Sequence, residues 1–129
     1  NQIKYNEKDL MKKFLPILAL VFSCSAFAVC DTGVSQSELN ICTANEYKKE
    51  DQKLNKVYNA YIAKLDKNRK YKVKGVQLNW IKYKDSDCKY QASAYQGGSM
   101  QSFVLNSCLT KKTKLRTQEL QSYLEEANR

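Results

Sequence analysis

Cysteine positions restrict the fold of this chain more than any other feature. Cysteines stand at positions 30, 42, 88 and 108, with a fifth at position 24. The fifth lies in an N-terminal segment that we expect to be removed on export, which leaves an even number. An even count in an exported chain favours two disulfides, and four cysteines allow three pairings. Zinc binding is the weaker interpretation, because the chain has no histidine and no Cys-x-x-Cys motif.

Residues 11–28 have the pattern of a secretory signal peptide. Met11 begins a short basic stretch, an apolar run follows, and Ala26-Phe27-Ala28 fits the small-x-small cleavage pattern. The run is shorter than the roughly 18 apolar residues of a membrane-spanning helix. We therefore expect cleavage after Ala28, a periplasmic or secreted location, and residues 1–10 to be upstream residues or an expression remnant.

Residues 29–129 form the expected mature chain, whose length suits a single domain with one modest core. The net charge of +9 falls to +7 in this part, because the leader carries four lysines and two acidic residues. The lysines are scattered over the outer faces of the predicted helices, as on a solvated surface. We expect no nucleic-acid partner for an exported chain, whereas its charge would attract anionic envelope polymers or lipid headgroups.

The spacing of apolar residues predicts an all-α fold. Residues 29–129 contain no proline, and a 3.6-residue period is common while strand-like alternation is scarce. We predict helices over about 37–65, 71–95 and from after the Gly97-Gly98-Ser99 turn to about 127, with Ser35 or Ser37 as the first cap. The charged stretch 66–72 is predicted to be a connection. The result is a small three-helix bundle, with the last two helices as a hairpin.

Each predicted helix has one inner face. On the first helix it comprises Leu39, Tyr47, Leu54, Val57, Tyr58, Tyr61, Ile62 and Leu65. On the second it comprises Val73, Val76, Trp80, Tyr83, Cys88 and Ala94. On the third it comprises Leu105, Leu109, Leu120, Tyr123 and Leu124.

These faces select one disulfide pairing from the three. Cys42 lies on the flank of the first helix, where it suits a bond to Cys30 in the N-terminal arm. Cys88 and Cys108 lie opposite each other near the turn of the hairpin. Closing the loop between them contributes about 3 kcal/mol in the chain-entropy model.

Charged side chains interrupt all three inner faces. Because desolvation costs several kcal/mol per ion, buried charges need partners. We predict that they form a buried network that sets the register of the helices, with Asp51, Lys84, Asp87 and Arg116 as its members. Two alternatives stay open: a polar ligand pocket between the helices, or charges that remain solvated.

Catalysis finds little support in the sequence. The chain lacks histidine, the usual general base, and shows no nucleophile motif or phosphate-binding loop. Neighbouring carboxylates such as Glu50 and Asp51 point about 100° apart on a helix. We therefore expect a binding protein with no cofactor and no metal. The segment from Trp80 to Cys88 is interpreted as core helix ending in a disulfide anchor.

The hairpin tip is the predicted partner-binding surface. Three apolar side chains beyond the turn point away from the inner face of the third helix, next to the disulfide. The surface consists of Gly97, Gly98, Ser99, Met100, Phe103 and Val104. The alternative is that these residues cover the N-terminal arm around Cys30.

From about Cys30 to Leu120 the chain resembles the lysozyme inhibitor LprI-like N-terminal domain family. The resemblance rests on residues in a fixed order and spacing: Asn40-Ile41-Cys42, Tyr47, Asp51, Leu54-Asn55, Tyr58, Gln77, Trp80, Tyr83-Lys84-Asp85, Cys88, Gly97-Gly98-Ser99, Cys108-Leu109, Thr113, Arg116 and Leu120. Two positions depart from the family pattern. Lys84 stands where the family usually has arginine, and Lys112 stands where an apolar residue is usual.

The resemblance implies a disulfide-stapled helical envelope protein that binds and blocks a lysozyme-like hydrolase. The charge of the chain favours a partner with an acidic surface. Two other functions therefore stay open: a periplasmic immunity protein against a secreted antibacterial toxin, and a structural module that binds anionic envelope polymers.

Overall fold

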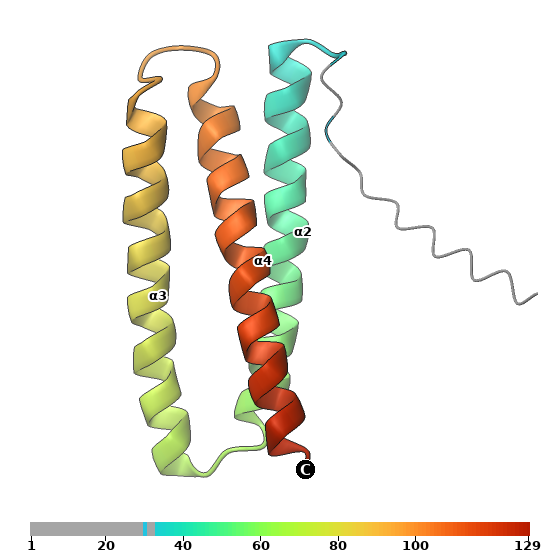
Figure 1. Cartoon of the computed structure of the whole chain (residues 1–129), viewed down its shortest axis with the longest axis vertical. Coiled ribbons are helices and arrows are strands. Elements are labelled where there is room, and N and C mark those ends of the chain that lie inside the picture. The colour runs from blue at the N-terminus through green and yellow to red at the C-terminus, as the bar shows by residue number, and fades with distance from the viewer. Residues whose placement is uncertain (1–29, 31–32) are drawn as a thin grey trace, which may run out of the picture.

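The computed structural model describes residue 30 and residues 33–129, and these form a three-helix bundle. The predicted signal peptide and cleavage site lie outside the described residues. Helix α2 spans Gln36–Ile62, α3 spans Lys67–Ser93 and α4 spans Gln101–Ala127. In Figure 1, α3 runs in the opposite direction to α2 and α4. The all-α fold is confirmed, and the described part contains no strand.

Two side-chain caps fix where α2 and α3 begin. The Ser35 hydroxyl accepts a hydrogen bond from the backbone N–H of Glu38, and the Glu38 carboxylate accepts one from the backbone N–H of Ser35. Asp66 caps α3 by accepting from the backbone N–H of Arg69 at 2.9 Å. Such caps satisfy N–H groups that have no partner within the helix.

The cap at Asp66 corrects one predicted boundary. Residues 67–72 were expected to belong to a connection, but they form the first turns of α3. Lysine and arginine are good helix formers, so a run of them continues a helix once a cap is present. Helix α2 ends at Ile62, three residues before the predicted end, and Leu65 is buried in the turn that follows.

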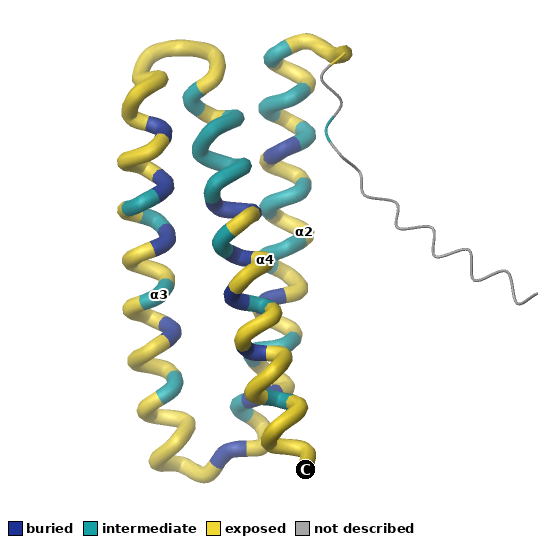
Figure 2. Tube along the Cα trace, in the orientation of Figure 1, coloured by how far each residue is buried: buried dark blue, intermediate teal, exposed yellow. Residues whose placement is uncertain are grey.

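Helix α4 packs closely against both other helices, whereas α2 and α3 are held together mainly through long side chains. Buried positions follow the facing sides of the three helices (Figure 2). The apolar core is built from Leu54, Tyr61, Leu65 and Leu120. It lies in the half of the bundle that contains the α2–α3 turn. In the other half, the buried positions hold Leu109, small or polar side chains and the Cys88–Cys108 disulfide.

The inner face of α3 differs from the predicted one. Val76, Tyr83 and Ala94 were expected to be buried and are exposed. The buried row consists instead of Gln77, Lys84, Cys88 and Ala92. The apolar pattern misled the prediction because two polar side chains occupy inward positions and find partners on the other helices.

Both disulfides match the predicted pairing. Cys30 bonds to Cys42 with their Cα atoms 5.8 Å apart, and Cys88 bonds to Cys108 with their Cα atoms 5.5 Å apart. The first holds the N-terminal arm to α2, and the second joins α3 to α4 near the hairpin tip. Within the described residues, no helix is long and apolar enough to cross a membrane.

Candidate binding groove between α2 and α3

Lys84 is the central residue of the space between α2 and α3. Its side chain is almost wholly buried, with the residue 5% exposed. Its Nζ donates a hydrogen bond to the Tyr47 hydroxyl at 2.8 Å and lies 3.4 Å from a carboxylate oxygen of Asp85. The ammonium also sits 5.2 Å from the ring centre of Tyr47 and 5.3 Å from that of Trp80. Such contacts with aromatic faces stabilise a desolvated cation.

The charge of Lys84 is retained at neutral pH. Burial lowers the pKa of Lys84, but the hydrogen bond to Tyr47 and the interaction with the Asp85 carboxylate raise it above its ordinary value. A protonated lysine has three donors, and Tyr47 takes one of them. Lys84 is therefore a fixed positive charge held between two aromatic rings.

Arg116 is the second buried cation, and it lies on α4. Its Nε donates to the side-chain oxygen of Gln77 on α3 at 3.0 Å, and its Nη1 donates to Glu119 at 2.8 Å. The remaining nitrogen, Nη2, is buried and has no hydrogen-bond partner among the described residues. Glu119 itself has a side chain that is 57% exposed, so the guanidinium is buried while its counter-charge faces solvent.

The predicted network among Asp51, Lys84, Asp87 and Arg116 does not form as a unit. Asp51 accepts a hydrogen bond from Asn55 on its own helix, and Asp87 pairs with Lys112. Within the described residues, no hydrogen bond or ion pair joins any two of the four. Lys84 binds chiefly to the neutral Tyr47, which periodicity had placed on the inner face of the first helix. Arg116 binds Glu119 and the neutral Gln77, which periodicity had not singled out.

The pair Asp87–Lys112 joins α3 to α4 beside this space. Lys112 Nζ lies 2.8 Å from the Asp87 carboxylate, 3.0 Å from the Tyr83 hydroxyl and 4.4 Å from the centre of the Tyr83 ring. Hydrogen bonding to Lys112 lowers the pKa of Asp87. The same bond, and that with Tyr83, raise the pKa of Lys112. Lys112 thus joins α4 to α3 through an ion pair.

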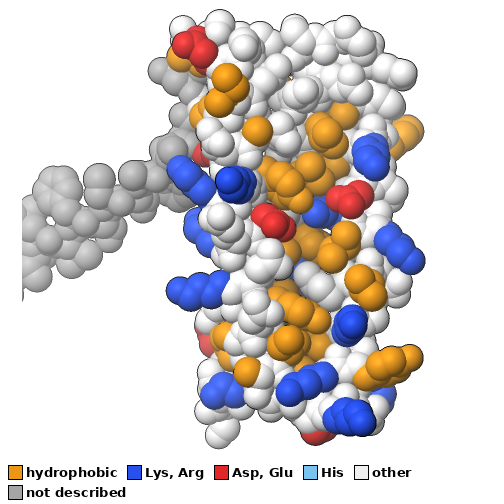
Figure 3. All heavy atoms as spheres, turned by 180° about the vertical axis from the view of Figure 1, so that it is seen from behind, with side chains coloured by type: hydrophobic (Ala, Val, Ile, Leu, Met, Phe, Trp, Pro, Cys, Tyr) orange, Lys and Arg blue, Asp and Glu red, His pale blue; other side chains and the backbone are white. Residues whose placement is uncertain are grey.

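A groove of about 450 Å³ opens above Lys84 between α2 and α3. Its apolar lining includes Leu54 and Tyr58 from α2 and Trp80 from α3, with exposed Leu78 and Ile81 at its edge. Asp51 and Lys84 also line it. Figure 3 shows apolar side chains continuing along this face of the molecule, with Lys and Arg gathered towards the end that holds the α2–α3 turn.

The sequence left a polar pocket between the helices open as an alternative but did not place it, because the groove belongs to two helices at once. Periodicity assigns each side chain to an inner or an outer face of its own helix. It does not reveal how far apart two helices stand, and here α4, not α2, is the close neighbour of α3. One signal in the sequence could have indicated the groove. Gln77 and Lys84 are seven residues apart and therefore lie on the same side of α3 as Trp80.

The hairpin tip is ordered by contacts with α2. Gly97 has φ of +78°, a left-handed conformation that favours glycine. The backbone oxygen of Ser99 accepts a hydrogen bond from the Asn40 side chain at 2.9 Å. Met100 is exposed, whereas Phe103 and Val104 are half-buried. The tip, which includes Gly98, is thus held to α2 by a hydrogen bond. Its role in binding a partner stays a prediction.

Chemically, the groove offers apolar and aromatic side chains and one buried ammonium, an arrangement that suits binding. No group of three or more His, Cys, Asp or Glu side chains able to hold a metal occurs in the described part of the chain. Its aromatic walls and buried ammonium suit an extended or helical protein segment that presents apolar side chains and a carboxylate.

Comparison with known proteins identifies a family and a similar protein. Residues 30–120 match the family described as lysozyme inhibitor LprI. The chain is also 31% identical over 137 aligned positions to the uncharacterized protein R02472 of Rhizobium meliloti (strain 1021), covering 91% of this chain and 99% of that protein. No solved structure matches.

Proposed function

This chain belongs to the lysozyme inhibitor LprI family, and from that premise we propose that it is an exported binding protein that inhibits a lysozyme-like cell-wall hydrolase by binding to it. The observation that carries the proposal is the extent of the family match, which covers residues 30–120 and thus almost the whole bundle. The two disulfides are typical of an extracytoplasmic protein, where such a hydrolase is met.

We propose that the α2/α3 groove is the surface that contacts the hydrolase. It combines exposed apolar residues, Leu78 and Ile81, with aromatic walls and a fixed cation at its base. Interfaces of this kind obtain most of their binding energy from a few apolar and aromatic anchors. A carboxylate on the partner would gain a charge-assisted hydrogen bond from a spare donor of Lys84. The hairpin tip is the competing surface.

The charge of the chain favours a second candidate function. A domain of +7 is attracted to partners with an acidic surface and is repelled at long range by basic ones. An immunity protein against an acidic secreted toxin fits this charge as well as an inhibitor of an acidic hydrolase does. The same surfaces would serve either partner.

A binding and inhibition assay tests the proposal. The purified protein is titrated into lysozymes that span basic to acidic isoelectric points while cell-wall hydrolysis is followed. We expect stoichiometric inhibition of at least one enzyme, tightest where the enzyme surface is acidic. Absence of inhibition across the panel, with capture of a toxin from envelope extracts, would move the function to the immunity candidate.

Surface variants then locate the interface. Ile81→Asp places a charge at the edge of the groove, and Phe103→Ala and Gly98→Asp alter the tip. We expect Ile81→Asp to weaken inhibition at least about tenfold, as loss of an interface anchor does, while the tip variants retain it. Tyr90→Ala on an exposed part of α3 is the matched control. Loss of inhibition in the tip variants alone would place the interface at the tip.

A further inference from the structure

A second pocket, of about 330 Å³, lies at the end of the bundle where the α2–α3 turn meets the C-terminal part of α4. All three helices contribute to it: Tyr61 from α2, Arg69 from α3, and Tyr123 and Glu126 from α4. The pocket is separate from the α2/α3 groove and shares no lining residue with it.

Two tyrosine rings form the aromatic side of this pocket. Tyr61 is buried in the apolar core, and the Tyr123 ring packs on it with ring centres 5.7 Å apart and planes tilted by 48°. Tyr123 is nevertheless 42% exposed. Tyr61 therefore holds the Tyr123 ring in place while much of that ring stays accessible to a ligand.

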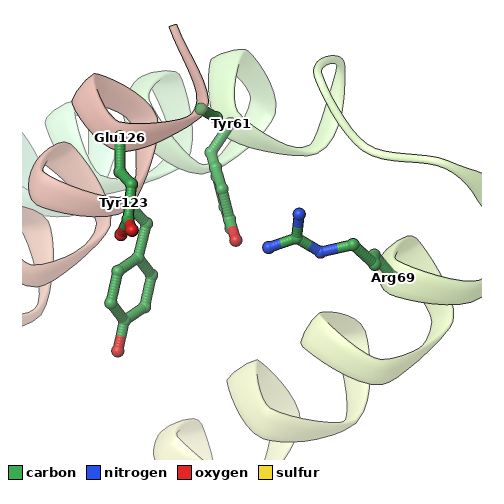
Figure 4. A pocket seen from close by; sticks show the side chains of 5 residues that line it. Tyr61, Arg69, Tyr123 and Glu126 are labelled. Carbon is green, nitrogen blue, oxygen red and sulfur yellow. The ribbon is translucent and has the colours of Figure 1, made fainter. Parts of the chain in front are cut away.

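Two opposite charges complete the pocket without neutralising each other. Within the described residues, neither the Arg69 guanidinium nor the Glu126 carboxylate makes a hydrogen bond or an ion pair. Figure 4 shows the Tyr61 hydroxyl pointing towards the Arg69 guanidinium, with Glu126 on the far side of Tyr61 from Arg69. The guanidinium is free to bind an anionic group through two parallel hydrogen bonds, and the carboxylate is free to accept hydrogen bonds from hydroxyl groups.

The surroundings of the pocket are strongly basic. Residues 64–74 hold six Lys or Arg and a single acidic residue, Asp66. Asp66 is engaged as the cap of α3, and none of the six cations takes part in an ion pair within the described part. Figure 3 shows this concentration of positive charge at the same end of the molecule. The local potential therefore favours a ligand with a negative charge.

We propose that this pocket binds a sugar that carries an anionic group. The carboxylate or phosphate of the sugar binds Arg69, the C–H face of its ring packs on Tyr123, and its hydroxyls donate to Glu126. A bare inorganic anion would gain nothing from the tyrosine ring and would be repelled by Glu126. A neutral sugar would leave the guanidinium unused. The volume is at the lower end of the range for small-molecule pockets and suits a single sugar unit.

Calorimetric titration of the purified protein tests this site without reference to any hydrolase. The probes are N-acetylmuramic acid as a carboxylated sugar, glucose 6-phosphate as a phosphorylated one, N-acetylglucosamine and glucose as their neutral counterparts, and inorganic phosphate. We expect one or both charged sugars to bind at least about tenfold more tightly than their neutral counterparts, because a charge-assisted bond contributes that much. They should also bind more tightly than inorganic phosphate, which cannot pack on the Tyr123 ring and is repelled by Glu126. The charged sugar that binds identifies the anionic group.

Two variants at the pocket and one control variant locate the binding. Arg69 is exposed, so Arg69→Gln leaves the core intact, and we expect it to weaken binding of the charged sugar about tenfold or more. Lys89→Gln removes one exposed cation from α3 away from the pocket and should leave binding unchanged. Tyr123→Leu should weaken binding while thermal melts confirm that the protein folds. Equal affinity of the parent and Arg69→Gln, equal affinity for charged sugars and inorganic phosphate, or no binding of either charged sugar at millimolar concentration would overturn the proposal.

Discussion

The Nζ of Lys84 on α3 lies 2.8 Å from the hydroxyl oxygen of Tyr47 on α2, and this hydrogen bond joins two helices whose backbones do not pack closely. The bond replaces the pairing with Asp51 or Asp87 expected from the sequence. The carboxylate nearest to this buried ammonium, that of Asp85, lies 3.4 Å away and is half-exposed, so it pairs with Lys84 only weakly. The neutral hydroxyl of Tyr47 is therefore the main buried acceptor for Lys84. The stability of the α2/α3 side should therefore depend on a single oxygen atom of Tyr47.

Tyr47→Phe removes that oxygen and keeps the ring. We expect a loss of about 1–3 kcal/mol in the free energy of unfolding, because a buried charged donor is left without its acceptor. Urea denaturation gives the measurement. Tyr90→Phe, on an exposed ring, is the control and should change nothing measurable. If both variants unfold at the same urea concentration as the parent, Lys84 has another acceptor in solution.

The Asp87–Lys112 pair predicts a stability that falls in acid. Lys112 lowers the pKa of Asp87 below the value of 3.8 expected for the unfolded chain. A carboxylate whose pKa is lower in the folded state stabilises the fold fully at pH values above its pKa in the unfolded chain. That stabilisation is lost as the pH falls through the pKa of the folded state. Below about pH 4, we expect the melting temperature of Asp87→Asn to decrease less with falling pH than that of the parent. Parallel pH profiles for parent and variant would show that the pair is not linked to folding.

The contribution of Lys112 to folding stability has the opposite pH dependence, because it is lost at high pH. The hydrogen bonds to Asp87 and Tyr83 raise the pKa of Lys112 above 10.5. Its contribution is present below that value and is lost as the pH rises through the folded pKa. Lys112→Met should therefore flatten the melting temperature profile in strongly alkaline buffer, measured against the parent. A variant profile as steep as that of the parent would contradict this linkage.

Arg116 is expected to respond differently to two substitutions. Arg116→Met keeps much of the packed volume but leaves the buried side-chain oxygen of Gln77 without its donor, so stability should fall by about 1–3 kcal/mol. Arg116→Ala also leaves a cavity and should cost about 2–4 kcal/mol. Because the side chain of Glu119 is largely exposed, neither change strands a buried carboxylate. Thermal melts compare the stability of the two Arg116 variants. Leu120→Ala, which removes a buried apolar side chain, is the reference for the loss caused by a core cavity. Equal losses for Met and Ala would show that the guanidinium itself is needed.

Removing the Cys88–Cys108 disulfide with a double Ala substitution should lower stability by about 3 kcal/mol. Cys88 is fully buried, and the bond lies in the half of the bundle that has few large apolar side chains. The Cys30–Cys42 bond closes a shorter loop and should contribute less in the chain-entropy model. Denaturation of the two double variants compares them directly. A larger loss at Cys30–Cys42 would show that the N-terminal arm carries more of the fold than its position implies.

The sequence alone determined the helical class, the three segments and both disulfide pairings. Apolar spacing, the Gly97-Gly98-Ser99 turn and the positions of the cysteines on helix faces are local properties, and each helix expresses them by itself. Ser35 was one of the two caps predicted for the first helix, and the structure selects it through its bonds with Glu38, three residues away. Asp66 had the same local signal, but the surrounding run of charge was interpreted as a connection.

Only the tertiary structure decided which side chains of α3 are buried and what they bind. Gln77 and Lys84 are inward because Arg116 and Tyr47, on other helices, supply partners for them. A polar residue is buried when its hydrogen bonds can be made there, and that depends on atoms tens of residues away. The α2/α3 groove and the pocket around Arg69 arise in the same way, from the distances between helices. The periodicity of a single helix contains no information about those distances.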